Sequence, residues 1–187
     1  MEDSAFRGKL VWLTEENPEV IAGYITRWNR DSEYWRLSTS DPSRMFSPQK
    51  VKEWIEKDME KEPSNIFNFA IRTLAEDRLI GFIGLDGVNW NHGDAFVGIG
   101  IGERELWGKG YGTDAMRIIL GYAFRELNLH RLTLDVFEYN PRAVRSYEKA
   151  GFKVEGRARK MLHREGRRWD LIYMGILKEE WEHLEEK

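Results

Sequence analysis

Apolar positions recur at two spacings along the chain, and the two spacings mark out different elements. The clearest helical stripe lies in residues 113–127 and consists of Met116, Ile119, Leu120, Ala123 and Leu127. The alternation of Leu132, Leu134 and Val136 predicts a strand over residues 131–139. Shorter apolar runs predict four further strands, over residues 9–13, 66–74, 79–85 and 95–101.

Proline pairs mark where three further helices begin. The pairs Asn-Pro at 17–18, Ser-Pro at 47–48 and Asn-Pro at 140–141 each place a capping side chain before a proline that suits the first helical turn. The first helix is expected to reach about residue 29. Residues 62–65 are expected to end the second helix, and Gly151 the third. The segment 30–46, rich in Ser, Asp and aromatic residues, is expected to be irregular.

The C-terminal part predicts a β-hairpin of residues 152–163 and 168–177 that turns at 164–166, followed by a short charged helix. No linker, repeat or low-complexity tract divides the chain. We therefore expect one domain over residues 1–187, of the mixed α/β (α+β) class, with a central sheet flanked by helices and a strand–helix–strand unit in its middle.

Composition narrows the class of protein. The chain has 187 residues, of which 41% are hydrophobic and 33% are charged, as in globular domains. It contains no cysteine, which excludes a disulfide framework, a cysteine-ligated metal and a thiol nucleophile. The net charge of −3 argues against nucleic-acid binding through the overall field. Residues 1–4 lack the features of a signal peptide, and the apolar stretch 118–124 is far too short to span a bilayer, so we expect a cytoplasmic protein without a membrane anchor.

The segment 107–113 reads Trp-Gly-Lys-Gly-Tyr-Gly-Thr and lies between a predicted strand and the strongest predicted helix. Glycine allows close backbone approach, and the start of a helix offers unpaired N–H groups, so the segment is a candidate phosphate site. Its glycine spacing fits neither a nucleotide P-loop nor the dinucleotide fingerprint. From spacing alone, a plain strand-to-helix turn stays possible.

The same segment resembles the acyl-CoA pyrophosphate loop of the GCN5-related N-acetyltransferase (GNAT) superfamily, whose pattern is Arg/Gln-x-x-Gly-x-Gly/Ala. Trp107 stands in place of the Arg or Gln, as in a branch that resembles ribosomal-protein N-terminal acetyltransferases and spermidine acetyltransferases. Further positions match in order, namely Asn140, Ala143, Tyr147, Gly151, Phe152, Val154, Glu155, Gly156, Gly166, Asp170 and Met174. The resemblance implies a mixed sheet of about seven strands. It places acetyl-CoA, without a metal, against Gly100, Ile101, Gly102, Trp107, Gly108, Lys109, Gly110, Tyr111, Gly112, Thr113, Asn140 and Lys149.

The resemblance also implies the chemistry: an acetyl group passes to a primary amine by direct attack in a ternary complex. It places Tyr147 near the CoA sulfur, where a phenol of pKa ~10 can protonate a thiolate whose own pKa is ~8.5. From helical spacing alone, packing of Tyr147 is the alternative. Related sequences often carry a Glu base where this chain has Phe96, and Asp86, Asp94 or a water relay stay open as substitutes. The four histidines fit no metal spacing.

The acceptor stays open between a protein N-terminus, such as that of a ribosomal protein, and a small amine such as a polyamine. Tyr34, Trp35 and Met45 are expected either to line the acceptor cleft or to pack in the core. A homodimer is possible by analogy with the family. Two other classes are weighed beside the enzyme: a non-catalytic acyl-CoA sensor, and a nucleic-acid-binding domain that uses the basic hairpin around residues 157–168.

Overall fold

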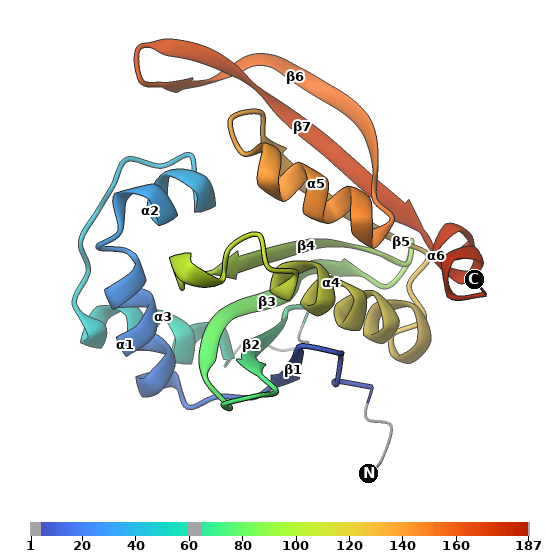
Figure 1. Cartoon of the computed structure of the whole chain (residues 1–187), viewed down its shortest axis with the longest axis horizontal. Coiled ribbons are helices and arrows are strands. Elements are labelled where there is room, and N and C mark those ends of the chain that lie inside the picture. The colour runs from blue at the N-terminus through green and yellow to red at the C-terminus, as the bar shows by residue number, and fades with distance from the viewer. Residues whose placement is uncertain (1–4, 60–64, 187) are drawn as a thin grey trace.

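The computed structural model describes residues 5–59 and 65–186 and contains one mixed seven-stranded sheet (Figure 1). The strands lie in the order β1-β2-β3-β4-β5-β7-β6. Their bounds are β1 (Val11–Thr14), β2 (Phe67–Thr73), β3 (Leu79–Asn89), β4 (Asp94–Ile101), β5 (Arg131–Phe137), β6 (Lys153–Arg164) and β7 (Arg167–Leu177). Only the central pair, β4 and β5, runs parallel; every other neighbouring pair is antiparallel. The expected fold class is confirmed.

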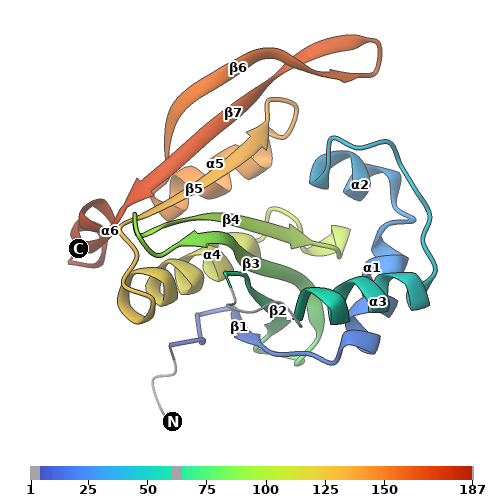
Figure 2. The same cartoon turned by 180° about the vertical axis from the view of Figure 1, so that it is seen from behind.

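The helices cover the sheet unevenly. They are α1 (Pro18–Trp28), α2 (Ser32–Ser38), α3 (Pro48–Met59), α4 (Tyr111–Gly121), α5 (Pro141–Ala150) and α6 (Lys178–Glu185). In Figure 1, α4 and α5 lie side by side in front of the sheet, while α1, α2 and α3 gather at one end of it. Figure 2 shows the same arrangement from behind, with β3, β4 and β5 facing the viewer. Within the described ranges, no helix is both long and apolar enough to cross a membrane.

The core forms where α4 packs on the sheet. The predicted stripe is confirmed, because Met116, Ile119 and Leu120 are fully buried. The predicted helix 113–127 changes character near its end, since Tyr122–Glu126 forms a π-helical turn. This turn carries Phe124 into the core, where its ring packs against Trp181 at 5.4 Å between centroids.

Local signals predicted the start of α1 and the end of α5 correctly. The side chain of Asn17 accepts a hydrogen bond from the backbone N–H of Glu19, with Pro18 as the first helical residue. Gly151 ends α5 with φ of 107°, a conformation that favours glycine. The expected helix stop at 62–65 lies outside the described residues except for its last position.

The expectation of an irregular segment over residues 30–46 is wrong in part, because Ser32–Ser38 forms α2. Asp31 explains the helix, since its carboxylate accepts hydrogen bonds from the backbone N–H groups of Glu33 and Tyr34. The aromatic composition of the segment obscured this capping signal. The helix places Tyr34 beside Gly100 of the central strand β4.

A buried carboxylate joins the start of the first strand to α4, the helix that follows the glycine-rich segment 107–113. Asp114, in the first turn of α4, is 7% exposed. It accepts hydrogen bonds from the backbone N–H groups of Lys9, Leu10 and Val11 at 3.2, 2.7 and 3.0 Å. Gly8 lies directly against the carboxylate, where a Cβ would be 2.4 Å from Oδ2. The clamp therefore holds residues 8–11 at the N-terminal end of α4.

Replacing Asp114 with alanine should lower the free energy of unfolding by about 2–3 kcal/mol, because it leaves three backbone donors without their anionic acceptor. Urea unfolding followed by circular dichroism measures the change. Asp86→Ala is the matched control, since Asp86 is an exposed aspartate on β3. A loss for Asp114→Ala no larger than that of the control would contradict the clamp.

Candidate active site

The parallel strands β4 and β5 pair over only three residues and then separate. Asp94, Ala95 and Phe96 face residues 131–133, and no further pairs follow. Beyond Phe96, β4 stays paired with β3 on its other side up to Ile101. The edge of β4 that faces β5 is therefore open to an extended ligand, which can add to it as another strand would.

A pocket of about 840 Å³ occupies this wedge. Its walls come from the separated parts of β4 and β5, from the N-terminal part of α4, from most of the length of α5, and from α2. Among the residues expected to bind acetyl-CoA, those that line it are Gly100, Ile101, Trp107, Gly108, Gly110, Tyr111, Gly112, Thr113, Asn140 and Lys149. Tyr147 lines it as well. Their roles toward a ligand stay predictions, but the fold brings them to one cavity.

The glycine loop opens the first turn of α4 toward the pocket. Gly108 and Gly110 have φ values of 74° and 94°, so both occupy the left-handed region that favours glycine. Gly110 is also the N-cap residue of α4, and the backbone N–H groups of the turn that follows are those without partners inside the helix. Thr113 ties this turn to α5 through a 2.8 Å hydrogen bond with Ser146. The arrangement is suited to bind a phosphate group.

Trp107, the departure from the family pattern, connects both walls of the wedge. Its indole N–H donates a 2.7 Å hydrogen bond to the backbone carbonyl of Ile101 at the end of β4. The guanidinium of Arg142, on α5, lies 3.8 Å from the centroid of the Trp107 ring. Such stacking is favourable because a cation is attracted to the face of an indole. Trp107 thus anchors the glycine loop to β4 and holds Arg142 in the pocket.

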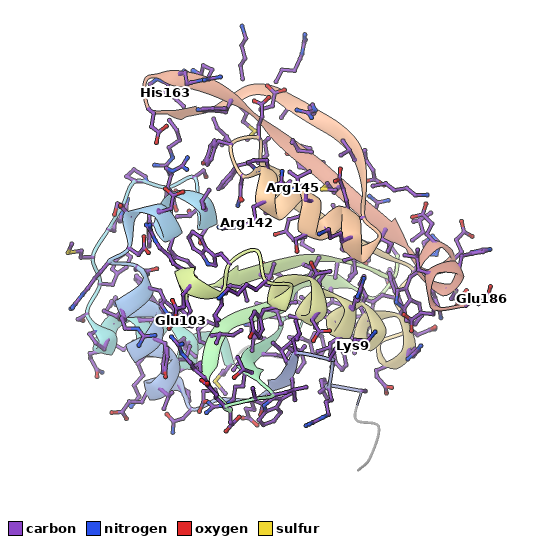
Figure 3. All side chains as sticks on the ribbon, viewed as in Figure 1. Lys9, Glu103, Arg142, Arg145, His163 and Glu186 are labelled. Atoms are coloured by element: carbon purple, nitrogen blue, oxygen red, sulfur yellow. The ribbon has the colours of Figure 1, made fainter. Side chains whose placement is uncertain are left out.

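Cations approach the pocket from two sides. Arg142, Arg145 and Lys149 come from α5, while Lys9 and Arg117 come from the other wall. Figure 3 shows Arg142 and Arg145 on α5 and Lys9 beyond α4. A ligand that carries several phosphates suits such a wall. Sequence reasoning found only Lys149, because nothing in the chain's pattern shows that residue 9 lies beside residue 114.

Tyr147 is held in the protonated form. Withdrawal from solvent raises the pKa of its phenol to about 12, and the negative charge of Asp135 acts in the same direction. The nearby Arg142 opposes this shift and does not cancel it. A phenol with such a pKa stays protonated throughout the physiological range.

Asn140 is buried at the start of α5, where its side chain accepts a 3.2 Å hydrogen bond from the backbone N–H of Ala143. The expected N-cap is therefore confirmed. Because Asn140 also lines the pocket, its amide group has a second face available to a ligand.

Two residues expected to bind acetyl-CoA lie outside the pocket lining. Gly102 is buried beneath Trp28, where a Cβ would stand 1.9 Å from the indole Cδ2. Its small size therefore serves packing: Trp28 donates a 2.9 Å hydrogen bond to Glu103, which also binds Arg27 and Arg78. Lys109 is exposed at the tip of the loop.

Of the residues expected to bind the acceptor or to act as the base, only some line the pocket. Tyr34 lines the pocket, and its hydroxyl would be 2.9 Å from a Cβ on Gly100, so that glycine makes room for it. Trp35 and Met45 lie outside the lining, and Met45 is 85% exposed. Neither Asp86 nor Asp94, the substitutes considered for a general base, borders the pocket.

One acid that sequence reasoning missed does border the pocket. Asp135, on β5, lines it together with Tyr147. Desolvation by the surrounding walls raises the pKa of its carboxyl above the ordinary value. In sequence it is only one more exposed position of an alternating strand, and no spacing signal distinguishes it. Within the described residues, no three His, Asp or Glu side chains are grouped so as to hold a metal ion.

Comparison with known proteins gives consistent results. Residues 10–153 match the family model described as "Acetyltransferase (GNAT) domain". The chain is 30% identical over 170 residues to YdaF of Bacillus subtilis (strain 168), named a ribosomal N-acetyltransferase, with 91% of each chain covered. It is 36% identical over 107 residues to the spermidine N(1)-acetyltransferase of Vibrio cholerae, covering 57% of this chain and 61% of that one. A crystal structure of the V. cholerae spermidine N-acetyltransferase with CoA and spermine superposes with a TM-score of 0.80 at 27% identity, covering 91% and 97% of the two chains.

Substitution of Gly112 tests the phosphate site without disturbing the fold. A Cβ at Gly112 would meet only ordinary contacts, at 3.8 Å from Ile101 and Ser146, so both alanine and aspartate should be accepted by the helix. Gly112→Asp should weaken acetyl-CoA binding by at least about 30-fold, because like charges brought together cost ~2 kcal/mol or more. Gly112→Ala is the matched control in isothermal titration calorimetry. Equal affinities of the two variants would contradict the site.

Proposed function

The chain belongs to the acetyltransferase (GNAT) family and is an acetyl-CoA-dependent N-acetyltransferase of amines, and from this premise we propose that its acceptor is a polypeptide N-terminus. The charge of the acceptor side of the pocket carries the proposal. The fold does not discriminate between acceptors, because the similar proteins include both a ribosomal N-acetyltransferase and a spermidine acetyltransferase.

The carboxylates of α2 are already engaged. Asp31 binds the guanidinium of Arg104, and this pairing lowers the pKa of the Asp31 carboxyl. Glu33 binds Arg36 through hydrogen bonds of 3.2 and 3.1 Å, which lowers its pKa likewise. A polyamine carries a cation at each end and along its length, and it needs several carboxylates that are free to receive it. Carboxylates that are already paired with arginine side chains bind a polyamine poorly.

The carboxylates of the pocket lining also argue against a polyamine acceptor. Asp114 is committed to the backbone of residues 9–11, which leaves Asp135 as the carboxylate in the lining that faces an acceptor. Arg142 adds a positive charge to the same cavity. One open carboxylate matches one ammonium group, as at a polypeptide N-terminus.

The surface beside the pocket also suits a polypeptide. Leu37 and Phe137 add apolar area to its acceptor side. Arg164, on the β6–β7 hairpin, donates hydrogen bonds to the backbone carbonyls of Thr39 and Asp41, which joins the hairpin to the segment after α2. The hairpin carries a cluster of basic residues, namely Arg157, Arg159, Lys160, Arg164, Arg167 and Arg168. A chain with acidic residues behind its N-terminus would be attracted to this surface.

In this proposal Tyr147 is the general acid. The CoA thiolate leaves the tetrahedral intermediate, and a neutral phenol in the pocket donates its proton to it. The raised pKa of Tyr147 ensures that the proton is present when the thiolate forms. A module that only senses acyl-CoA would need neither this phenol nor an open acceptor side. The cytoplasmic location and the homodimer stay predictions.

An acceptor panel tests the proposal. Release of free thiol from acetyl-CoA is measured with peptides that begin with Ser or Ala, with spermidine and with aminoglycosides. A peptide should exceed spermidine in kcat/KM by at least about tenfold, since one unmatched ammonium group costs ~1.4 kcal/mol or more. Preference for spermidine would contradict the proposal.

Tyr147→Phe should lower kcat by about 100-fold or more, the range of general acid catalysis, with little change in acetyl-CoA affinity. Rates with the best acceptor of the panel and calorimetric binding of acetyl-CoA measure the two quantities. Unchanged turnover in this variant would remove Tyr147 from the mechanism.

A further inference from the structure

Asp135 occupies a special position at the apex of the wedge. The last parallel pair between the central strands joins Phe96 to Thr133. Two residues further on, Gly98 and Asp135 point to the same face of the sheet as that pair, because side chains alternate along a strand. A Cβ at Gly98 would have no atom within 4 Å, so the space beside it is open. Asp135 is therefore the first side chain on this face of β5 after the strands part.

The apex is also where the thioester of acetyl-CoA is expected. Tyr147, the predicted proton donor to the CoA sulfur, lines the same pocket as Asp135. The two groups interact electrostatically, since the charge of Asp135 contributes to the raised pKa of Tyr147. Both side chains therefore border the space in which an amine would attack the thioester.

Asp114, the other carboxylate of the pocket lining, accepts three backbone hydrogen bonds, whereas Asp135 has no hydrogen-bond or ion-pair partner within the described residues. Arg131, four positions earlier on the same face of β5, binds Glu155 and donates a hydrogen bond to Thr133. Phe96 fills the position at which related sequences often carry a glutamate base. In this chain the carboxylate that borders the pocket, Asp135, therefore lies on the neighbouring strand β5.

We propose that Asp135 binds the acceptor ammonium group and removes its proton. The ammonium gives one proton to the Asp135 carboxylate, and the freed nitrogen lone pair forms a bond to the carbonyl carbon of acetyl-CoA. The C–S bond of the tetrahedral intermediate then breaks, Tyr147 gives its proton to the thiolate, and the second proton of the nitrogen returns to Tyr147. The products are the N-acetyl amide, the CoA thiol and one proton that Asp135 releases to solvent.

The groups that face Asp135 support this division of roles. Tyr147 and Arg142 come from α5, Tyr34 comes from α2, and Tyr173 is its register partner on β7. Burial raises the pKa values of the Tyr147 and Tyr34 phenols, so Asp135, and not either of these two, titrates on the acid side. Its pKa is raised from the ordinary value, which strengthens it as a base. Activity should therefore fall as the pH drops through the pKa of Asp135.

Asp135→Asn keeps the shape of the side chain and removes its charge. With the best acceptor, kcat/KM should fall by about 100-fold or more at neutral pH, while acetyl-CoA affinity stays within about twofold. The acid limb of the pH profile should disappear. An acyl hydrazide, whose terminal nitrogen is already neutral at neutral pH, should react with wild type and variant at rates within about fivefold of each other.

Asp86→Asn is the matched control, because Asp86 lies on β3, away from the pocket, and should leave every rate unchanged. A variant of Asp135 that keeps the wild-type rate and acid limb would overturn the proposal. An equal loss with the amine and with the hydrazide would overturn it as well, because a merely structural role predicts that result. The comparison uses whichever amine reacts best, so preference for spermidine would contradict the polypeptide acceptor and leave this test intact.

Discussion

The separation of β4 from β5 after three residue pairs is the constraint on which the rest of the structure depends. A continuous parallel pair would satisfy its own backbone groups and leave no cavity between the strands. Once the strands part, the inner edge of β4 is exposed, and the helices that follow each strand begin at the mouth of the opening. Both α4 and α5 therefore present their N-terminal turns to the same space.

Several contacts between segments far apart in sequence hold this opening in shape. Asp114 ties the first strand to the start of α4, and Thr113 ties α4 to α5. Trp107 binds the end of β4 through its indole and supports Arg142 through its ring. Glu103, just beyond the same end of β4, fixes Trp28 and thereby the position of α1. Hydrogen bonds and a cation–π contact thus hold the segments that border the pocket in place.

The opening also separates two kinds of chemistry. Tyr147 is withdrawn from solvent and held neutral, whereas Asp135 stands exposed in the cavity with its carboxylate uncommitted. An acid and a base that lie in one cavity can act on the two ends of the same reaction, because the nucleophile loses protons while the leaving group gains one. The cations of α5 line the same pocket, where a polyphosphate is expected.

Much of the fold followed from local signals in the sequence. Asn17, Asn140 and Gly151 bound their helices as predicted, because capping depends on neighbours within a few residues. The hydrophobic stripe of α4 and the alternation of β5 gave the core for the same reason. Tertiary contacts decided what was missed: the π-helical turn that buries Phe124 depends on packing against Trp181.

The residues of the candidate site could likewise be predicted from the sequence only in part. The glycine loop and Tyr147 are found by motif, and the fold brings them to one pocket. Asp135, Lys9 and Arg142 could not be found, because their importance depends on where β4 and β5 separate and on which segments meet there. Gly102 shows the converse, since a glycine that fits the pattern packs under Trp28 and lies outside the pocket lining.

Hydrogen exchange with and without acetyl-CoA tests the central claim most directly, because it locates the ligand along the whole chain. The account predicts slower exchange of backbone amides in residues 97–101 and 108–114, where β4 and the first turn of α4 border the wedge. The basic hairpin at 157–168 should be unaffected. Protection confined to that hairpin, with no change along β4 and the glycine loop, would show that the wedge is not the site of acetyl-CoA.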